Sequence, residues 1–245
     1  LIRLAYPILL PPIMARLARI VIPNVPHHVT QRGNRRLPVF FSDEDRVAYM
    51  QLLHEACAEH KTRCLAWCLM DNHIHLILVP DKPDGLRATL GEAHRRYSRR
   101  INFREGWRGF LFQGRFASYP MDDAHLIAAV RYVENNPVAA GIVAKAEDWR
   151  WSSARSHVAG KQAAGDPLTD VAALSQHVRN WRAYLALGVD AADDLATVEA
   201  IEARMRTGRP LASDAWIAHA EATMNRKLGL QKRGPKGKLP GGQQH

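Results

Sequence analysis

The chain has 245 residues, of which 47% are hydrophobic and 24% charged, a composition that is typical of globular proteins and excludes a disordered or collagen-like chain. It carries 34 Lys and Arg against 24 Asp and Glu, and the resulting net charge of +10 favours a polyanionic partner such as nucleic acid. The 3 cysteines argue against a disulfide framework and indicate a reducing cytosol, and no apolar run reaches the ~18 residues of a membrane span.

The first thirteen residues, LIRLAYPILLPPI, form an apolar stretch that is short and is not followed by an A-x-A cleavage site. A cleaved signal peptide is therefore not expected. We expect Met14 to be the true start and residues 1–13 to be upstream sequence.

The predicted elements begin with a strand over residues 25–32, which ends at the turn signal Gly33-Asn34. A helix is predicted from about residue 43 to residue 60. Ser42 stands at its N-cap position, and Asp45 is placed to complete a pair that resembles a capping box.

Two strands follow over residues 63–70 and 73–79, joined by a tight turn at Asp71-Asn72. Pro83-Asp84-Gly85 then opens a long helix over about 86–103. The two strands are expected to pair as a hairpin.

A short strand is predicted over residues 116–121, and Asp122-Asp123 start a helix that runs to Asn135 or Asn136. Pro137 is expected to end it, because proline disfavours helix in the preceding residue. The order β-α-β-β-α-β-α predicts an α+β fold: a ferredoxin-like antiparallel sheet with two helices on one face, and an extra helix beyond it.

Beyond about Gly160 the composition changes. Residues 183–203 carry five acidic and no basic residues, and residues 226–238 carry six basic and no acidic ones. The last stretch, QKRGPKGKLPGGQQH, is rich in Gly, Pro and Lys and is expected to be disordered. We therefore expect a catalytic-type domain over 14–158, a mostly helical C-terminal region over 159–230 and a basic tail over 231–245.

His73 and His75 are the first candidate site residues. Residues i and i+2 of a strand point to the same face, so the two imidazoles lie side by side at a spacing that suits one metal ion. Ile74 points to the opposite, helix-covered face. The H-x-H pattern is equally typical of two surface histidines on an exposed strand.

Tyr132 and Asn136 are the second pair, four residues apart on one predicted helix and hence on one face. A tyrosine hydroxyl can act as a nucleophile, and an asparagine oxygen can bind a hard cation such as Mg²⁺. A core tyrosine and a helix-terminating asparagine would produce the same pattern.

A basic stretch over residues 87–115 is the third signal, because arginines contact phosphates and aromatic side chains stack on unpaired bases. Alternatively, the aromatic residues pack in the core while the arginines form a solvated face. Arg95 and Arg99, like Arg96 and Arg100, lie four residues apart and so form a stripe. The interleaved set is Arg87, Arg95, Arg96, Tyr97, Arg99, Arg100, Phe103, Arg104, Trp107, Arg108, Phe110, Phe112 and Arg115.

A zinc site at Cys64 and Cys68, with His54, Cys57 and His60 nearby, is the competing interpretation. On a strand the two cysteines would lie ~13 Å apart, too far to share one ion. Buried structural cysteines explain the pattern better. The sequence contains neither a phosphate-binding glycine loop nor a nucleophile elbow.

Several stretches taken together resemble the REP-associated tyrosine transposases, relatives of the single-tyrosine transposases in the HUH endonuclease superfamily. They occur in order over residues 14–157: MARLARIVIPNVPHHVTQRGNRR, CLMDNHIHLILVP, GEAHRRYSRRINFREGWRGFLFQGRF, RYVENNPVAAGIV and DWRWSSAR. Asp71 is a departure, because relatives commonly have proline before the Asn-His-x-His stretch.

The resemblance implies the HUH fold and a role for each matching residue. His73 and His75 correspond to the paired histidines that bind a divalent metal, Mg²⁺ or Mn²⁺. Tyr132 corresponds to the nucleophile, and Asn136 to the polar residue that completes the metal site. All three catalytic residues, His73, His75 and Tyr132, are present in this sequence.

The implied activity is that of a transposase: a single-stranded DNA endonuclease and strand transferase that cleaves near palindromic, REP-like hairpins through a 5′-phosphotyrosine. A non-catalytic hairpin-binding regulator or an RNA-binding protein remains an alternative. A bacterial cytoplasmic location at the nucleoid is expected, with no membrane or protein partner evident and a monomer or homodimer both open. Expected DNA contacts are Arg95, Arg96, Arg99, Arg100, Arg115, Lys232, Arg233, Lys236 and Lys238.

Overall fold

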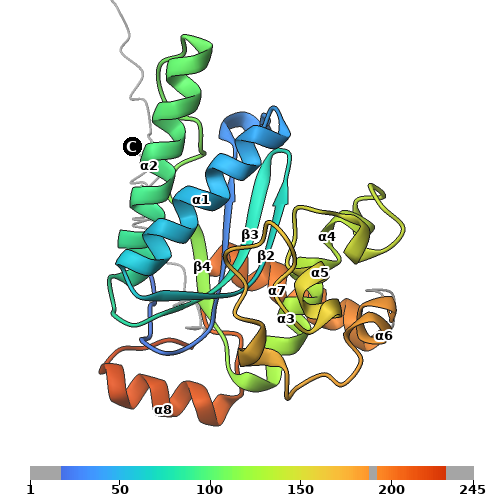
Figure 1. Ribbon diagram of the computed structural model, residues 1–245. Helices are drawn as coiled ribbons and strands as arrows, with labels where there is room; N and C mark the ends of the chain where they lie inside the picture. The colour runs from blue at the N-terminus through green and yellow to red at the C-terminus, as the bar shows by residue number, and fades with distance from the viewer. Residues whose placement is uncertain (1–17, 188–191, 230–245) are drawn as a thin grey trace, which may run out of the picture.

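The computed structural model describes residues 18–187 and 192–229 (Figure 1). Its centre is a four-stranded antiparallel sheet in the order β2-β3-β1-β4. The strands are β1 (His27–Arg32), β2 (Thr62–Met70), β3 (His73–Pro80) and β4 (Ala117–Pro120). This confirms the predicted α+β, ferredoxin-like fold. The predicted upstream extension 1–13 and basic tail 231–245 lie outside the described residues.

One face of the sheet is covered by α1 (Asp43–Glu59) and α2 (Gly85–Glu105), which lie side by side in Figure 1. The side chains between them and the sheet form a continuous buried core. Ile74 is fully buried in this core, as its place between the two histidines predicted. Burial of this apolar face is the main force that holds the two helices on the sheet.

The other face is covered as well, by α3 (Asp123–Glu134) and by helices from the C-terminal region. Alternate residues of β3 explain this: Leu76 and Leu78 enter the first core, whereas Ile77 and Val79 enter the second. A strand that is apolar on both sides needs a layer on each. The second layer contains α4 (Asn136–Ala139), α5 (Ala154–Ala159), α6 (Trp181–Ala186) and α7 (Ala192–Thr207).

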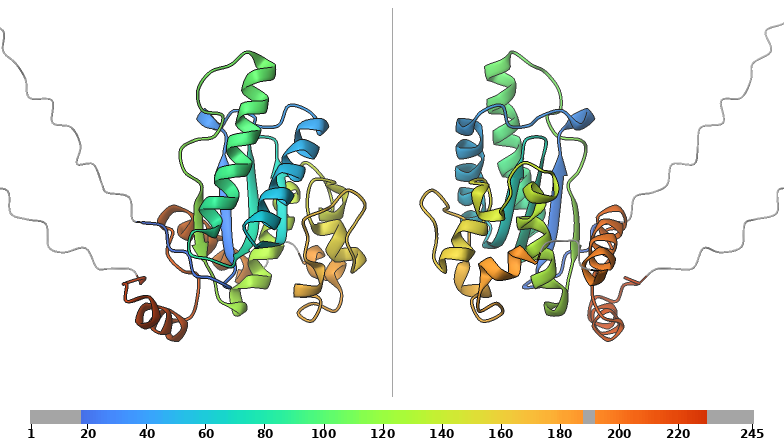
Figure 2. Two further views of the ribbon diagram at one scale, coloured as in Figure 1. Left: turned by 60° about the vertical axis from the view of Figure 1, so that its left-hand side comes forward. Right: turned by 90° about the vertical axis from the view of Figure 1, so that its right-hand side faces the viewer.

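Helix α8 (Asp214–Met224) lies at the periphery of the molecule in Figure 2. It forms a small separate cluster with the segment before β1, through Ile20, Ala220 and Leu228. Three short 3-10 helices, Asn34–Arg36, Ala146–Asp148 and Val171–Leu174, complete the described structure. None of the helices within the described ranges is both long and apolar enough to cross a membrane.

The start of α1 differs from the predicted capping box. Ser42 occupies the N-cap position, but its side chain makes no capping hydrogen bond. Asp45 is buried instead, where its carboxylate accepts a hydrogen bond from the Phe41 N–H at 3.0 Å and pairs with Arg104 of α2. Asp45 therefore ties α1 to α2, which a local sequence pattern does not reveal.

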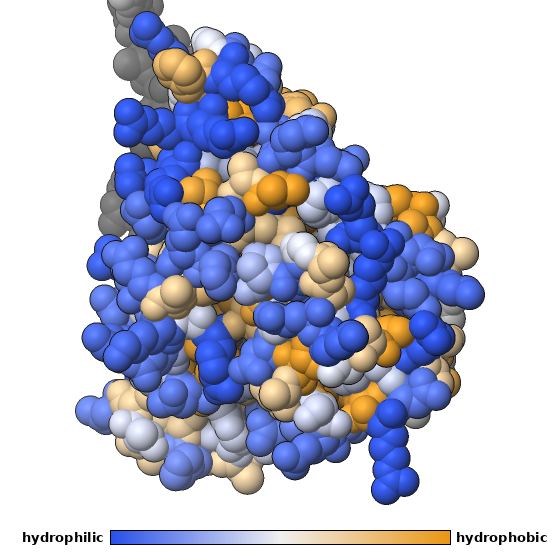
Figure 3. All heavy atoms as spheres, in the orientation of Figure 1, coloured by the Kyte–Doolittle hydropathy of each residue, from blue (hydrophilic) through white to orange (hydrophobic). Residues whose placement is uncertain are grey.

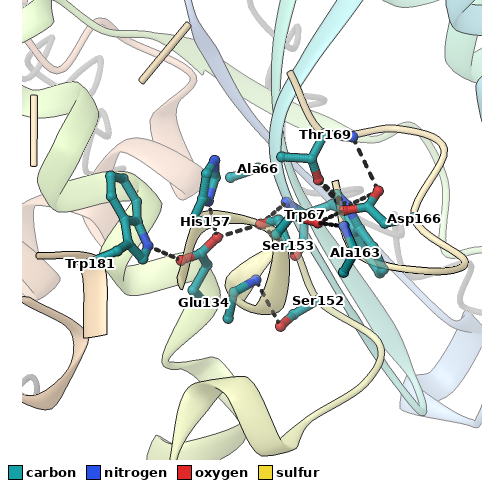
Figure 4. Close-up of polar contacts among 12 residues, drawn as sticks. Ala66, Trp67, Glu134, Ser152, Ser153, His157, Ala163, Asp166, Thr169 and Trp181 are labelled. Carbon is teal, nitrogen blue, oxygen red and sulfur yellow. Dashed lines mark hydrogen bonds and ion pairs between the residues drawn. The ribbon is translucent and has the colours of Figure 1, made fainter. Parts of the chain in front are cut away.

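The C-terminal end of α3 is fixed by a buried carboxylate, Glu134 (Figure 4). Its Oε1 accepts hydrogen bonds from His157 Nδ1 at 2.6 Å and Ser153 Oγ at 2.5 Å, and its Oε2 accepts one from Trp181 Nε1 at 2.7 Å. The donors come from α5, its N-cap and α6. The network thus connects the end of α3 to the C-terminal region.

A second buried carboxylate, Asp166, likewise accepts several hydrogen bonds from separate segments (Figure 4). It accepts hydrogen bonds from the Trp67 indole N–H at 3.2 Å and from the hydroxyls of Ser156 and Thr169 at 2.5 Å each. Trp67 belongs to β2, so this carboxylate anchors the segment after α5 to the sheet. The segment after residue 159 is therefore part of the packed structure.

Replacing Glu134 by alanine is expected to lower the free energy of unfolding by about 3–5 kcal/mol, because three buried donors lose their acceptor. Glu147→Ala is the matched control, since its ion-pair partner Arg182 has a largely exposed side chain and the pair should be worth under ~1 kcal/mol. Urea unfolding of both variants measures the difference. Equal, small losses in the two variants would show that the Glu134 network contributes little.

Candidate active site

The two predicted histidines lie on the face of β3 that is turned toward α3. The ring centroids of His73 and His75 are 5.0 Å apart, and the ring of Tyr132, on α3, lies 5.7 Å from that of His75. The side-chain nitrogen of Asn136 is 3.5 Å from His75 Nε2. The structure therefore brings together all four residues that the sequence analysis singled out for catalysis or metal binding.

Tyr132 and Asn136 lie on two helices and not on the predicted single helix. Helix α3 ends at Glu134, and Asn136 begins the separate short helix α4. Pro137 does not end a helix but lies in the first turn of α4. A backbone N–H at that position would have no acceptor within the helix, so proline is tolerated there. Asn136 still reaches His75, because the break between the helices is only one residue long.

The Nδ1 atoms of both histidines are engaged by neighbours. His73 Nδ1 lies 2.6 Å from Asn72 Oδ1, and His75 Nδ1 lies 2.9 Å from Nε2 of His28. His28 Nδ1 in turn lies 2.8 Å from the Tyr119 hydroxyl. If each Nδ1 carries the proton and donates, one tautomer satisfies the whole chain. The Nε2 lone pairs of His73 and His75 are then available to a ligand.

Burial also keeps these imidazoles neutral. It lowers the pKa of His73 to about 4, with the positive charge of Arg32 adding to the effect, and holds the pKa of His75 well below its ordinary value. Neutral imidazoles keep the lone pair that a metal ion requires. Burial raises the pKa of Tyr132 to about 12; Glu202 adds to this increase and Arg32 opposes it.

His28, Tyr119 and Arg32 are site residues that sequence reasoning missed. Arg32 stands opposite His73 in the register of β1 and β3, and its positive charge acts to lower the pKa of His73, His75 and Tyr132. His28 and Arg32 alternate along β1 and therefore share a face. The shared face could be predicted from the sequence. Only the pairing of β1 with β3 shows that it is the face of the sheet that carries His73 and His75.

Two buried histidines of β1 make stability depend on pH. Burial lowers the pKa of His27 to about 4 and that of His28 to about 3, whereas both would titrate near 6.5 in the unfolded chain. The folded state then binds fewer protons, so stability is complete above pH ~6.5 and falls as the pH decreases toward those lowered values.

We expect the free energy of unfolding at pH ~5 to be lower than at pH ~7 by up to about 2 kcal/mol for each of these histidines. Denaturant unfolding at the two pH values measures the loss, and His28→Asn should reduce its size. An unfolding midpoint that stays constant between the two pH values would contradict the burial of neutral histidines.

Four of the predicted DNA-contacting arginines, Arg95, Arg96, Arg99 and Arg100, belong to α2, which covers the face of the sheet opposite this site. Arg95 and Arg96 form ion pairs with Glu92 and Glu55. Arg115 lies between α2 and β4. Arg99, Arg100 and Arg115 are exposed. The four predicted tail contacts, Lys232, Arg233, Lys236 and Lys238, lie outside the described residues.

The interleaved aromatic residues divide between the two interpretations. Tyr97 and Phe112 are buried in the core, whereas Phe103, Trp107 and Phe110 are exposed. Exposed aromatic side chains beside arginines are available for stacking; the buried ones serve packing.

The cysteines match the structural interpretation. Cys57, Cys64 and Cys68 are free and buried, and burial raises the pKa of each thiol. Among the described residues, no three His, Cys, Asp or Glu side chains converge on a common point where they could hold a metal ion. A metal at His73 and His75 would therefore need a ligand of another type, and Asn136 is the side chain in place.

Asp71, the departure from the family pattern, lies in the turn before Asn72. Its carboxylate pairs with Arg46 of α1, which is nearly buried. Burial lowers the pKa of His73, and the negative charge of Asp71 opposes this in part, so Asp71 acts on the site through its charge.

Comparison with known proteins places the site in context. A family model described as "Transposase IS200 like" matches residues 22–136, which include His73, His75, Tyr132 and Asn136. No curated protein sequence matches the chain.

Eight solved chains match this one, among them two transposases. A structure of a REP-associated tyrosine transposase bound to a REP hairpin has a TM-score of 0.52 and 20% identity, covering 64% of this chain and 93% of that one. A putative transposase from Deinococcus radiodurans R1 has a TM-score of 0.35 and 20% identity, covering 48% and 95%. The first similarity shows that the two chains share a fold.

Proposed function

We propose that this chain cleaves and rejoins single-stranded DNA beside palindromic hairpins through a covalent 5′-phosphotyrosine, because residues 22–136 match the family model of IS200-like transposases. The observation that carries the proposal is the convergence of His73, His75, Tyr132 and Asn136 in one chain. A hairpin is the preferred substrate because the similar solved transposase is bound to one.

Tyr132 is the nucleophile of the proposed reaction. Its phenolic oxygen attacks the scissile phosphorus, a P–O bond to tyrosine forms, and the bond to the DNA 3′-oxygen breaks. The phenol gives up its proton and the 3′-oxygen gains one. A DNA 3′-hydroxyl then attacks the phosphotyrosine and reverses these changes, so the strand is rejoined without ATP.

Loss of the phenolic proton is the step that the surroundings must assist. Burial raises the pKa of Tyr132 to about 12, which favours the protonated, poorly nucleophilic form. The positive charge of Arg32 acts in the opposite direction. We infer that Arg32 assists formation of the phenolate and attracts the anionic DNA backbone to the same place.

The residues present fit a divalent metal ion. The two neutral imidazoles offer Nε2 lone pairs, and the amide oxygen of Asn136 would supply a harder donor after rotation of its amide group. Mg²⁺ and Mn²⁺ prefer oxygen ligands, so the amide oxygen of Asn136 and the oxygens of the DNA phosphate would complete the shell beside the two imidazoles. When bound, the ion would polarise the scissile phosphate as a Lewis acid.

A cleavage assay tests the proposal. The purified protein is incubated with end-labelled single-stranded DNA that forms hairpins with unpaired flanks, in Mg²⁺ or Mn²⁺ and then in EDTA. We expect a metal-dependent DNA–protein adduct on a denaturing gel. Tight binding of flanked hairpins without any adduct would instead indicate a non-catalytic hairpin-binding protein.

A further inference from the structure

Four of the eight exposed large hydrophobic side chains of the described residues, three of them aromatic, lie at one end of the sheet. They lie in the segment after β1 and in the segment from the end of α2 toward β4; we call residues 32–37 and 103–110 together the tip surface. Phe110 is 87% exposed, Phe103 90%, Leu37 59% and Trp107 49%. In Figure 3, hydrophobic residues at the top of the molecule, over the end of α2, are surrounded by strongly hydrophilic ones.

Backbone hydrogen bonds join the two parts of the tip surface. The Asn34 N–H donates to Leu111 O at 2.8 Å, and the Gln113 N–H donates to Arg32 O at 2.8 Å. Gly33 permits the tight turn of the first part, because a Cβ there would lie 2.0 Å from the carbonyl oxygen of Leu37. The loop that carries Phe110 is therefore fixed to the segment after β1 by backbone hydrogen bonds.

The same segment borders the candidate active site. Arg32 stands opposite His73 in the strand register, and the Gly33 N–H donates to Asn72 O at 2.8 Å. Asn72 in turn contacts the His73 ring through its side chain. A strand of DNA that leaves the site at this end of the sheet would meet the tip surface next.

The tip surface carries positive charge without compensation. Arg32, Arg35, Arg36 and Arg108 are exposed, and none forms an ion pair with any described residue. The acidic groups nearby are already engaged, since Asp45 and Glu105 pair with Arg104 and Asp71 pairs with Arg46.

Arg35 and Arg36 also have an unusual backbone. Both adopt positive φ, at 55° and 63°, a conformation that L-residues with long side chains rarely take. Such conformations cost free energy and cluster at ligand-binding segments. The strained pair displays two adjacent guanidinium groups at the surface that also carries Phe110.

We propose that the tip surface is a stacking platform for the unpaired bases of single-stranded DNA. Phe110 and Trp107 stack on the bases, and Arg35, Arg36 and Arg108 contact the phosphates. The assignment rests on the proposed function, because it places the unpaired strand next to the cleavage site. Duplex DNA presents no open base face, and a protein-docking surface would have a contiguous apolar centre rather than aromatics separated by arginines.

Paired substitutions separate stacking from simple apolar contact. Phe110→Tyr keeps an aromatic face, whereas Phe110→Leu keeps only an apolar side chain. Binding of an oligothymidine of about 20 nucleotides is measured by fluorescence anisotropy in EDTA, so that no cleavage is needed. Val47→Ala, an exposed apolar position on α1, is the control for unrelated surface change.

We expect Phe110→Leu combined with Trp107→Leu to weaken binding of the oligothymidine on the order of tenfold or more, and Phe110→Tyr to bind as the parent does. The salt dependence should be unchanged in the aromatic variants but reduced by about one ion in Arg108→Ala. Equal affinity of the parent and the double leucine variant would overturn the proposal. The proposal would also be overturned if the parent self-associates in sedimentation and the double leucine variant loses this self-association but keeps its affinity for DNA.

These outcomes are independent of catalysis. Binding of the tip-surface variants in EDTA is measured without cleavage, and the adduct assay tests the nucleophile Tyr132. A protein that binds through the tip surface but forms no adduct would retain this inference and refute the proposed strand transfer.

Discussion

Tyr132→Phe is expected to abolish the covalent DNA–protein adduct, by at least ~10³-fold, while leaving the affinity for a flanked hairpin within about twofold. The substitution removes one oxygen atom, and the ring still packs against His75 and His28. The adduct is measured on a denaturing gel and the affinity by anisotropy without metal.

Tyr119→Phe is the matched control for that experiment. Tyr119 is the other tyrosine in ring contact with His28, but its hydroxyl is buried and bound to His28 Nδ1. We expect this variant to keep the adduct at a rate lowered by about tenfold or less. Loss of the adduct in Tyr119→Phe together with its retention in Tyr132→Phe would refute the assignment of the nucleophile.

His73→Ala is expected to weaken Mn²⁺ binding by more than ~100-fold and to remove the adduct with it, because one of two imidazole ligands is lost. His73 is preferred over His75 for this test because it is partly exposed, and its removal should disturb the fold less. Calorimetric titration of the protein with Mn²⁺ in the absence of DNA gives the affinity.

His54→Ala is the control for His73→Ala, since His54 lies exposed on α1 on the opposite face of the sheet. Its Mn²⁺ affinity should match the parent. His28→Asn should weaken binding by about 10–100-fold, because His28 orients His75 without touching the ion itself. Unchanged Mn²⁺ binding in His73→Ala would place the metal elsewhere.

The fold was largely predictable because its signals are local. The strand β3 is an apolar run that ends at a proline, and the turn at Asp71-Asn72 fixes the hairpin. The shared face of His73 and His75 follows from the strand period alone. Their meeting with Tyr132 did not follow from spacing; the resemblance to a known family supplied it.

The missing parts depend on tertiary structure. Arg32 and His28 became site residues only through the register of β1 against β3. The role of Glu134 requires donors from α5 and α6, 19 to 47 residues later in the chain. The arginine stripe on α2 was correct as a helical pattern, yet the ion pairs of Arg95 and Arg96 could not be read from spacing.

Identification of the residue that carries the DNA is the most direct test of the central claim. Trypsin should release YVENNPVAAGIVAK, which contains Tyr132 and no other tyrosine, whereas Tyr119 lies in the preceding peptide. Tandem mass spectrometry of the nuclease-trimmed adduct should find a 5′-nucleotide on Tyr132. A nucleotide on Tyr119 or on any other residue would contradict the proposed mechanism.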